Sequence, residues 1–454
     1  MVKISDFLNL SARENVERAL AKAREHEAFH ALLSLSEDRA LERAAKVDAG
    51  EITGRLAGVP FIAKDNFLTL GDTTTAASKF LENFKAPLQA TAIEKLEAEG
   101  AICIGKANLD AYAHGGSTEN SAFGPTKNAH DQARVAGGSS GGSAVVVALD
   151  IVPFALGSDT GGSIRQPASF NGVVGVKPTY GTVSRYGVVA MASSTDTIGV
   201  LSADVEDAEL VMDILSGQDR KDMTTLPDFF VPTLIESPKR IGVIKEFMTE
   251  DVDADVRARV TEYIEAMKTK GHTVEEVSLP MVKYALGIYY IVVPAEISSN
   301  LGRYDGIRYG ARAEASSLGE VYGLSRDQGF MPENKRRIMI GSYVLSSGFF
   351  DAYYLQAQKA RTLLINEFNK IFESFDVIVG PVAPTPAFKL GENTEDPVKM
   401  YLADIMTVPA SLAGLPAVSV PAGVTNEGLP VGVQLIGPRK SDALLLALAK
   451  EGEK

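Results

Sequence analysis

The sequence predicts an α/β protein in which one large mixed β-sheet is flanked by helices. Short apolar runs with the length of buried strands alternate with longer segments whose apolar residues recur at helical spacing. Predicted helices end at Gly100 and Gly271, and a strand-like run follows each glycine. The composition is that of an ordinary globular protein, with 45% hydrophobic and 23% charged residues.

These patterns place the elements along the chain. We expect helices at residues 11–35, 92–99, 144–149, 253–270 and 352–372. We expect strands at residues 59–63, 101–106, 152–156, 241–244, 273–277, 376–379, 417–420 and 431–436, the last two of which close the sheet. Residues 220–239 are polar and contain prolines, which is typical of a surface loop more than of a domain boundary. All 454 residues are therefore expected to form a single domain.

Charge and cysteine content exclude several classes of protein. The formal net charge is −13, which argues against a nucleic-acid-binding surface on this chain but not on a partner. One cysteine rules out an internal disulfide, and Cys103 has the setting of a buried strand thiol. One cysteine and five scattered histidines leave no zinc-ligand spacing, so no metal site is expected. No signal peptide or membrane-spanning run is visible, so we expect a soluble, cytoplasmic protein.

The most informative stretch of the chain holds two clusters of glycine and serine, at residues 137–143 and 157–163. A flexible linker is excluded because each cluster adjoins a predicted helix or strand. A phosphate-binding loop is excluded because no Gly-Lys-Ser/Thr follows the glycines. The Gly-x-Ser-x-Gly turn of α/β-hydrolases is not present either.

Such loops suit a serine nucleophile. Glycines let the backbone approach a reacting carbonyl closely, so the N–H groups of Thr160, Gly161 and Gly162 are candidates for an oxyanion hole beside Ser163. The serine needs a base, and no histidine lies in either cluster. Lys64 follows five apolar residues, and burial favours the neutral amine that can act as a base. For Lys64 taken alone, a solvated charge at a strand end is the alternative.

Together these residues resemble the amidase signature family. Residues 138–142 and 159–167 match its signature closely, and residues 64–66 match its lysine motif. The resemblance implies the amidase signature fold. It also implies that Ser163 is the nucleophile, that Lys64 is the base, and that Ser139 is the bridging serine on a cis peptide.

Further segments are similar to one branch of that family, the A subunits of tRNA-dependent amidotransferases; they are residues 117–128, 176–187, 299–306, 335–339 and 401–416. The similarity implies a catalytic core at about residues 50–200 and glutamine-pocket segments at about residues 285–440. Arg337 would hold the α-carboxylate of glutamine and Asp404 its α-ammonium. Tyr289 or Tyr290 would add a hydroxyl contact, and the choice between them is open. A surface arginine, a helix-terminal aspartate and core tyrosines are the alternatives.

The activity that the resemblance implies is hydrolysis of glutamine through a Ser163 acyl-enzyme. Ammonia would pass to a partner that converts Glu-tRNA(Gln) to Gln-tRNA(Gln), in a heterotrimer with the B and C subunits of the amidotransferase. tRNA would be bound only through the partner, which would also use ATP and Mg²⁺; this chain would need no cofactor. Two other classes stay open, a free-standing amidase for another small carboxamide and a non-catalytic assembly protein. Arg337 and Asp404 argue against the first, and the intact Lys64, Ser139 and Ser163 against the second.

One segment departs from the pattern of the branch. Ala111 and His114 stand where that branch usually has glutamate and methionine, which bears on the shape of the pocket. His114 is expected to have a structural role.

Overall fold

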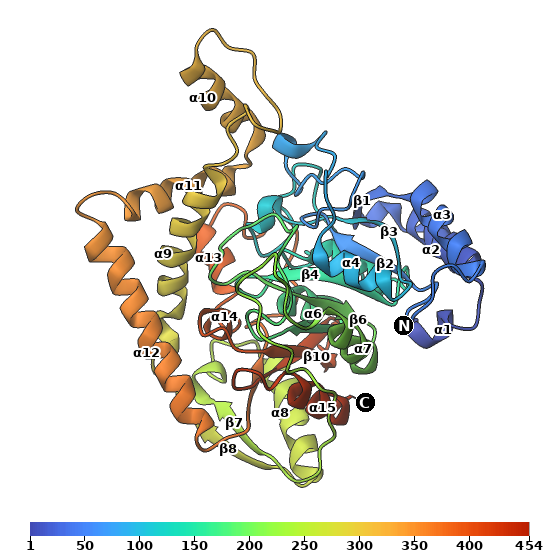
Figure 1. The fold of residues 1–454 in the computed structure, drawn as a ribbon. Coiled ribbons are helices and arrows are strands. Elements are labelled where there is room, and N and C mark those ends of the chain that lie inside the picture. Colours follow the sequence, from blue (N-terminus) through green and yellow to red (C-terminus); the bar gives the residue numbers. More distant parts are fainter. Residues whose placement is uncertain (454) are drawn as a thin grey trace.

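The computed structural model describes residues 1–453, which form one α/β domain around an eleven-stranded mixed sheet (Figure 1). The strand order is β1-β3-β2-β4-β6-β5-β10-β11-β9-β7-β8. The strands are β1 (Leu32–Leu35), β2 (Pro60–Lys64), β3 (Ile102–Ala107), β4 (Phe154–Asp159), β5 (Val174–Lys177), β6 (Thr197–Ser202), β7 (Arg240–Ile244), β8 (Thr273–Val277), β9 (Val377–Pro381), β10 (Ala417–Val424) and β11 (Pro430–Ile436). The predicted fold class is confirmed.

The direction of the strands divides the sheet into three parts. β2 pairs in parallel with β3 and β4 near one end, and β7 pairs in parallel with β8 and β9 at the other. Between them, β6, β5, β10 and β11 make antiparallel pairs. The last two strands of the chain, β10 and β11, therefore complete the sheet in its interior, between β5 and β9.

Helices flank this sheet along its length (Figure 1). They are α1 (Ile4–Phe7), α2 (Ala12–Glu25), α3 (Glu37–Asp48), α4 (Thr91–Ala98), α5 (Gly141–Ala148), α6 (Arg165–Asn171), α7 (Val205–Leu215), α8 (Ala254–Thr269), α9 (Val282–Leu301), α10 (Leu318–Gly329), α11 (Pro332–Val344), α12 (Leu355–Phe372), α13 (Pro397–Leu402), α14 (Val408–Leu412) and α15 (Asp442–Gly452). The helices α9, α11 and α12 lie together on one side, far from α1–α3. Within residues 1–453, no helix combines the length and apolar content that crossing a bilayer requires.

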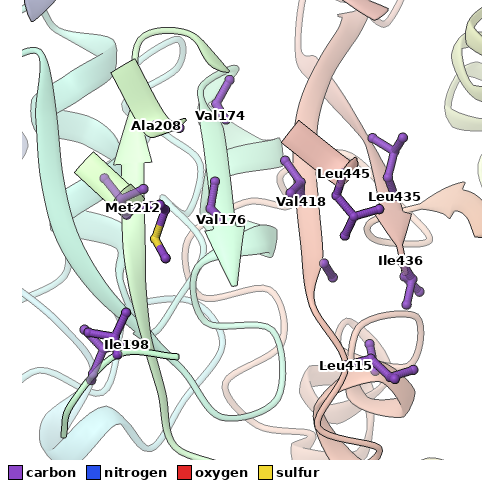
Figure 2. Close-up of a cluster of buried hydrophobic side chains, with 14 of the residues drawn as sticks. Val174, Val176, Ile198, Ala208, Met212, Leu415, Val418, Leu435, Ile436 and Leu445 are labelled. Carbon is purple, nitrogen blue, oxygen red and sulfur yellow. The ribbon is translucent and has the colours of Figure 1, made fainter. Parts of the chain in front are cut away.

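The centre of the sheet is the hydrophobic core (Figure 2). Val174 and Val176 of β5 are two residues apart and therefore face the same side of the sheet, where Met212 of α7 packs. Leu435 of β11 and Leu445 of α15 belong to the same cluster. Each of these side chains is nearly inaccessible to water, and burying one such group contributes about 1.5–3 kcal/mol. This packing makes the sheet a rigid platform for the loops at its edge.

Most predicted elements are found within a few residues of their expected bounds. Helices α4 and α8 each lead to a glycine with positive φ, which is +86° at Gly100 and +96° at Gly271, and a strand follows. Residues 220–239 contain no helix or strand, as a surface loop requires. The strand predicted at residues 152–156 begins at Phe154 and extends to Asp159, so part of the second glycine–serine cluster is strand.

The helix predicted at residues 11–35 is wrong in its second half. Helix α2 ends at Glu25, a 3-10 turn follows, and the chain reverses at His30, whose φ is +53°. Leu32–Leu35 then forms the edge strand β1, which pairs antiparallel with β3. The apolar residues after Glu25 continue at a spacing that is compatible with a helix and with a strand, so periodicity alone did not mark the end of the helix.

Candidate active site

The two glycine–serine clusters meet at the carboxyl end of β4. The first leads into α5, and the second begins within β4 and leads into α6 through residues 160–164. Strand β2 lies parallel to β4, so Lys64 at its end comes beside Ser158. The backbone N–H of Ser140 donates to the carbonyl of Ser163 at 3.1 Å and ties the two clusters together. The peptide bond between Gly138 and Ser139 is cis.

Lys64 lies at the centre of this site and contacts three serine hydroxyls. It is 0% exposed, and its Nζ donates to the hydroxyls of Ser139 at 2.8 Å, Ser140 at 2.9 Å and Ser158 at 3.0 Å. Burial lowers the pKa of Lys64 to about 7, although nearby carboxylates, including Asp110, oppose the shift. A substantial fraction of Lys64 is therefore neutral near neutral pH, which is the form that can accept a proton.

The hydrogen bonds around Lys64 distinguish Ser139 from Ser140 and Ser158, because the hydroxyl of Ser139 has no partner other than the lysine within residues 1–453. The hydroxyl of Ser140 also donates to the carbonyl of Ser158 at 3.2 Å, so its own proton is engaged. The Ser158 hydroxyl accepts a second bond, from Asn66 Nδ2 at 3.1 Å. The Ser139 hydroxyl has no further partner within residues 1–453, so its proton is free for the lone pair of a neutral Lys64.

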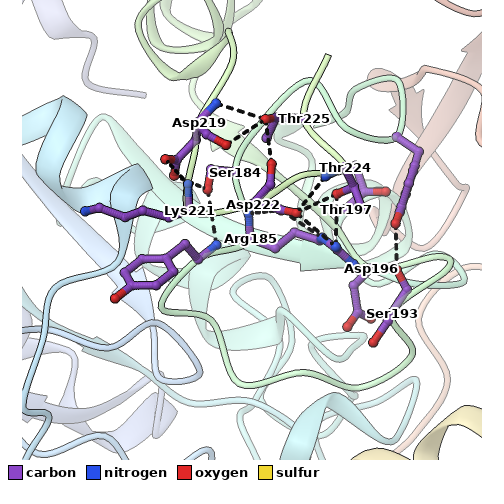
Figure 3. Close-up of polar contacts among 12 residues, drawn as sticks. Ser184, Arg185, Ser193, Asp196, Thr197, Asp219, Lys221, Asp222, Thr224 and Thr225 are labelled. Carbon is purple, nitrogen blue, oxygen red and sulfur yellow. Dashed lines mark hydrogen bonds and ion pairs between the residues drawn. The ribbon is translucent and has the colours of Figure 1, made fainter.

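Behind Ser158 lies a cavity of about 200 Å³, whose lining includes Ser158, Arg185, Asp196 and Asp222. Arg185 donates to both carboxylate oxygens of Asp222, and further hydrogen bonds from this loop hold the wall in place (Figure 3). Asp196 accepts the Thr160 hydroxyl at 2.8 Å. Residues 185–196 thus contact the surface loop through Arg185 and the loop of the second cluster through Asp196.

Ser163 ends the loop after β4 and is 7% exposed. No hydrogen bond joins the hydroxyls of Ser163 and Ser139, both of which lie within the described part of the chain. Hydrogen bonds between catalytic groups are often long without substrate and tighten when it binds. The structure thus brings Lys64 and Ser139 into contact and places Ser163 on the adjoining loop.

The loop before Ser163 presents unpaired backbone donors. Among residues 1–453, the N–H groups of Thr160, Gly161, Gly162 and Ser163 find no acceptor, although all four residues are buried. A buried N–H without an acceptor is costly, and a ligand oxygen would satisfy it. Asp159 holds the loop from below, because its carboxylate accepts the N–H of Ile164 at 3.2 Å and pairs with the buried Arg165 guanidinium at 3.0 Å.

A second group of polar residues lies beyond this loop, around Arg337 of α11. Its guanidinium donates through Nε to Glu333 at 2.7 Å and lies over the rings of Tyr290 and Tyr401, which stack at 3.8 Å. The Nη groups of Arg337 have no protein partner in the part of the chain that the structure describes. Arg337 also lines a cavity of about 180 Å³ with Asp110 and Glu333. A planar guanidinium with free Nη groups suits a carboxylate ligand.

Asp404 is the acidic counterpart of Arg337. Its Oδ1 is buried and accepts no hydrogen bond within residues 1–453. Burial raises the pKa of Asp404 to about 7, and the positive charge of Arg337 opposes that shift. A Cβ atom on Gly162 would lie 3.4 Å from Asp404 Oδ1, so this carboxyl group borders the loop of Ser163. An unpaired buried carboxylate is stabilised by a cationic ligand.

The side chains of Tyr289 and Tyr290 have different environments. A Cβ atom on Gly161 would come within 2.8 Å of the Tyr289 hydroxyl oxygen, so Tyr289 lies against the loop, and only glycine allows that approach. Burial raises the pKa of Tyr289, which keeps its hydroxyl protonated as a donor. Tyr290 instead stacks its ring on Tyr401, and Arg337 lies over both rings. Tyr289 is therefore the better candidate for a hydroxyl contact with substrate.

Several residues of this site were missed from the sequence. Ser140 and Ser158 stand in the two clusters, but no pattern distinguished them from Ser139. Glu333 and Tyr401, which orient Arg337, lie on α11 and α13, and only the fold brings them together. His114 is fully buried with Nδ1 at 2.7 Å from Asn334 Nδ2, and burial lowers its pKa, which fits a structural role.

Known proteins share this fold. A family model described as Amidase matches residues 14–446, so the chain belongs to the amidase family. The A subunit of the glutamyl-tRNA(Gln) amidotransferase of Latilactobacillus sakei subsp. sakei (strain 23K) is 53% identical over 433 residues, covering 93% of this chain and 88% of that protein. The crystal structure of the corresponding A subunit of glutamyl-tRNA(Gln) amidotransferase from Thermotoga maritima is 40% identical, with a TM-score of 0.83 over 99% of this chain and 94% of that one. A bacterial aryl acylamidase of the amidase signature family is 25% identical, with a TM-score of 0.87 over 100% and 96%.

Proposed function

We propose that this chain is the glutamine-hydrolysing subunit of a tRNA-dependent amidotransferase. It forms an acyl-enzyme on Ser163 and supplies ammonia to a partner that converts Glu-tRNA(Gln) to Gln-tRNA(Gln). The observation that carries the proposal is that Arg337 has free Nη groups and Asp404 has an unpaired Oδ1, both beyond the loop of Ser163 within residues 1–453. The carboxylate and ammonium of an amino acid complement these two groups.

The mechanism begins with a proton relay. Neutral Lys64 takes a proton from the Ser139 hydroxyl, which takes one from Ser163 as Ser163 Oγ bonds to the amide carbon. The N–H groups of Gly161, Gly162 and Ser163 stabilise the oxyanion. When the carbon–nitrogen bond breaks, the proton returns through Ser139 to the leaving nitrogen and gives ammonia. Water then adds to the ester with the same relay, glutamate leaves, and Ser163 regains its proton.

The rest of the reaction belongs to partners. We place tRNA at the partner subunits, because this chain has a net charge of −13, and we place ATP and Mg²⁺ there with the tRNA that they activate. A cytoplasmic heterotrimer with the B and C subunits accommodates this division. The connection between α11 and α12 exposes three aromatic side chains that suit a protein partner, with Phe349 37%, Phe350 38% and Tyr353 41% exposed. For this chain itself we propose no cofactor.

A free-standing amidase for another small carboxamide is the alternative function. The aryl acylamidase with the same fold acts on a different class of amide, so the fold alone does not decide between the two. An aryl amide, however, offers no charged group to satisfy buried Arg337 and Asp404. These two residues therefore favour glutamine, and their removal is the test.

We expect Arg337→Ala and Asp404→Ala to raise the KM for glutamine about 10- to 100-fold, since each removes a charge-assisted interaction of about 1.5–3 kcal/mol. The measurement is formation of Gln-tRNA by the chain assembled with its partner subunits, with glutamine or with free ammonia as donor. The KM for ammonia should stay unchanged, because ammonia has no amino-acid end. Lys335→Ala, which alters an exposed side chain on the same helix, is the control. If ammonia-driven amidation falls equally, both residues are structural and the glutaminase proposal loses its support.

The rate of glutamine hydrolysis should depend on the deprotonation of two groups. Burial brings the pKa of Lys64 and of Asp404 to about 7, and both must be deprotonated, the first as a base and the second to bind the ammonium. The charged groups facing them are Arg337, Arg165, Asp110, Asp159 and Asp196. Activity is therefore present above pH 7 and lost as the pH falls.

The measurement is kcat/KM across pH for two amides. Well below pH 7, glutamine should lose up to about 100-fold per pH unit, whereas a simple amide without an ammonium group should lose about 10-fold. Equal slopes for the two substrates would show that Asp404 does not titrate in glutamine binding. If kcat/KM does not change with pH for either amide, Lys64 is not a base with a pKa of about 7.

A further inference from the structure

A small polar space lies between Gly116, Gln166 and Asp404. A Cβ atom on Gly116 would lie 3.5 Å from Asp404 Oδ2 and 3.6 Å from Gln166 Nε2, which is ordinary contact with no clash. Within residues 1–453, Gln166 Nε2 and Asp404 Oδ1 are both buried without a hydrogen-bond partner. A donor and an acceptor that lack partners thus face the same point.

The orientation of the Gln166 amide is fixed by its other end. Gln166 is 0% exposed on α6, and its Oε1 accepts the backbone N–H of Gly138 at 2.9 Å. Because an N–H needs an acceptor, the oxygen must face Gly138, and the NH₂ group must face the space. Leaving a buried NH₂ group unpaired is costly, so the space suits an occupant with an acceptor atom.

The chemistry of the occupant follows from the two groups. The Asp404 carboxylate would be stabilised by a cationic donor, and the NH₂ group of Gln166 would be paired by an acceptor next to that donor. An α-amino acid carries an ammonium and a carboxylate on one carbon, so it offers both at once. An amide without an amino-acid end offers neither at this point.

We propose that Gln166 is a specificity-determining residue whose Nε2 donates to the α-carboxylate of the substrate while Asp404 holds its ammonium. Because Gly116 carries no side chain, nothing at this position separates that group from Gln166 and Asp404. This inference rests on the proposed function and deepens it, because it selects amides of α-amino acids over simple amides. Arg337 and Gln166 would then hold the carboxylate from two sides.

Two variants separate this role from a structural one. Gln166→Glu keeps the oxygen that accepts the Gly138 N–H but replaces the donor with a second acid beside Asp404. Gly116→Ala fills the space with one methyl group in ordinary contact. We expect each to raise the KM for glutamine at least tenfold with little change in kcat. Hydrolysis of propionamide, which has no amino-acid end, should keep its wild-type kcat/KM.

The readouts are glutamate release, propionamide hydrolysis and thermal unfolding of the purified chain. Gln166→Met serves as a scaffold control: it also removes the acceptor for Gly138, so it should slow propionamide as well. An unchanged KM for glutamine in Gln166→Glu and Gly116→Ala would overturn the inference and assign the space to a water molecule. Equal losses with both amides would overturn it in favour of a purely structural Gln166. If wild-type protein hydrolyses propionamide but not glutamine, the proposed function itself fails.

Discussion

Ser163→Ala should abolish glutamine hydrolysis while the fold and the glutamine pocket remain. The substitution removes the single oxygen that bonds to the amide carbon, and no other hydroxyl stands at the end of the loop with the free N–H groups. Loss of a nucleophile in a comparable serine relay costs about six orders of magnitude in turnover. Binding should persist, because Arg337 and Asp404 are untouched. Glutamate release and calorimetric titration with glutamine measure the two effects.

The matched control is Ser143→Ala. Ser143 is also a buried serine of the first cluster, but its hydroxyl donates to the carbonyl of Leu156 at 2.9 Å and does not contact Lys64. Its loss should cost about 1 kcal/mol of stability and leave turnover nearly unchanged. Near wild-type hydrolysis by folded Ser163→Ala would eliminate Ser163 as the nucleophile.

Lys64→Ala should cost a comparable amount of activity. The Lys64 amine contacts three serine hydroxyls, and it is the one hydrogen-bond partner of the Ser139 hydroxyl among residues 1–453. Because the relay acts as a unit, the double variant Lys64→Ala/Ser163→Ala should release glutamate no more slowly than either single variant. Rates of glutamate release for the three proteins test this expectation.

A second buried lysine provides the control for Lys64. Lys177 is also 0% exposed, and burial lowers its pKa to about 7, but its ammonium donates to the carbonyls of Pro178 and Leu415. Lys177→Met should lower the melting temperature while turnover of the folded protein stays within a small factor of wild type.

A double variant of Lys64 and Ser163 that is much slower than both single variants would mean that the two residues act independently.

The parts of the fold that the sequence predicted well are those with a local signal. β2 is a continuous apolar run that ends at a charge, and α4 and α8 are closed by glycines with positive φ. That the two clusters belong to one site was predicted from the family resemblance, which assigns Ser139 and Ser163 to the same relay. The positions of Lys64 and Ser139 follow from these local signals together with the family resemblance.

The remaining parts depend on contacts between distant segments. β5 and β6 are short and buried on both faces, so their sequences carry no alternation, and their place in the sheet is set by pairing with β4 and β10. α9 is apolar around most of its circumference and contains Pro294, which hides its helical period. The choice of Tyr289 over Tyr290 depends on which ring faces Gly161, and neighbouring residues of one helix cannot be ranked without the fold.

The most direct test of the account is to identify the covalent intermediate. The purified chain is mixed with glutamine, quenched in acid within one turnover, digested and analysed by mass spectrometry. The account predicts a glutamyl ester on the peptide that carries Ser163, present in the wild-type protein and missing from Ser163→Ala. A glutamyl group on any other residue, or glutamate formed in a burst with no adduct on the Ser163 peptide, would contradict it.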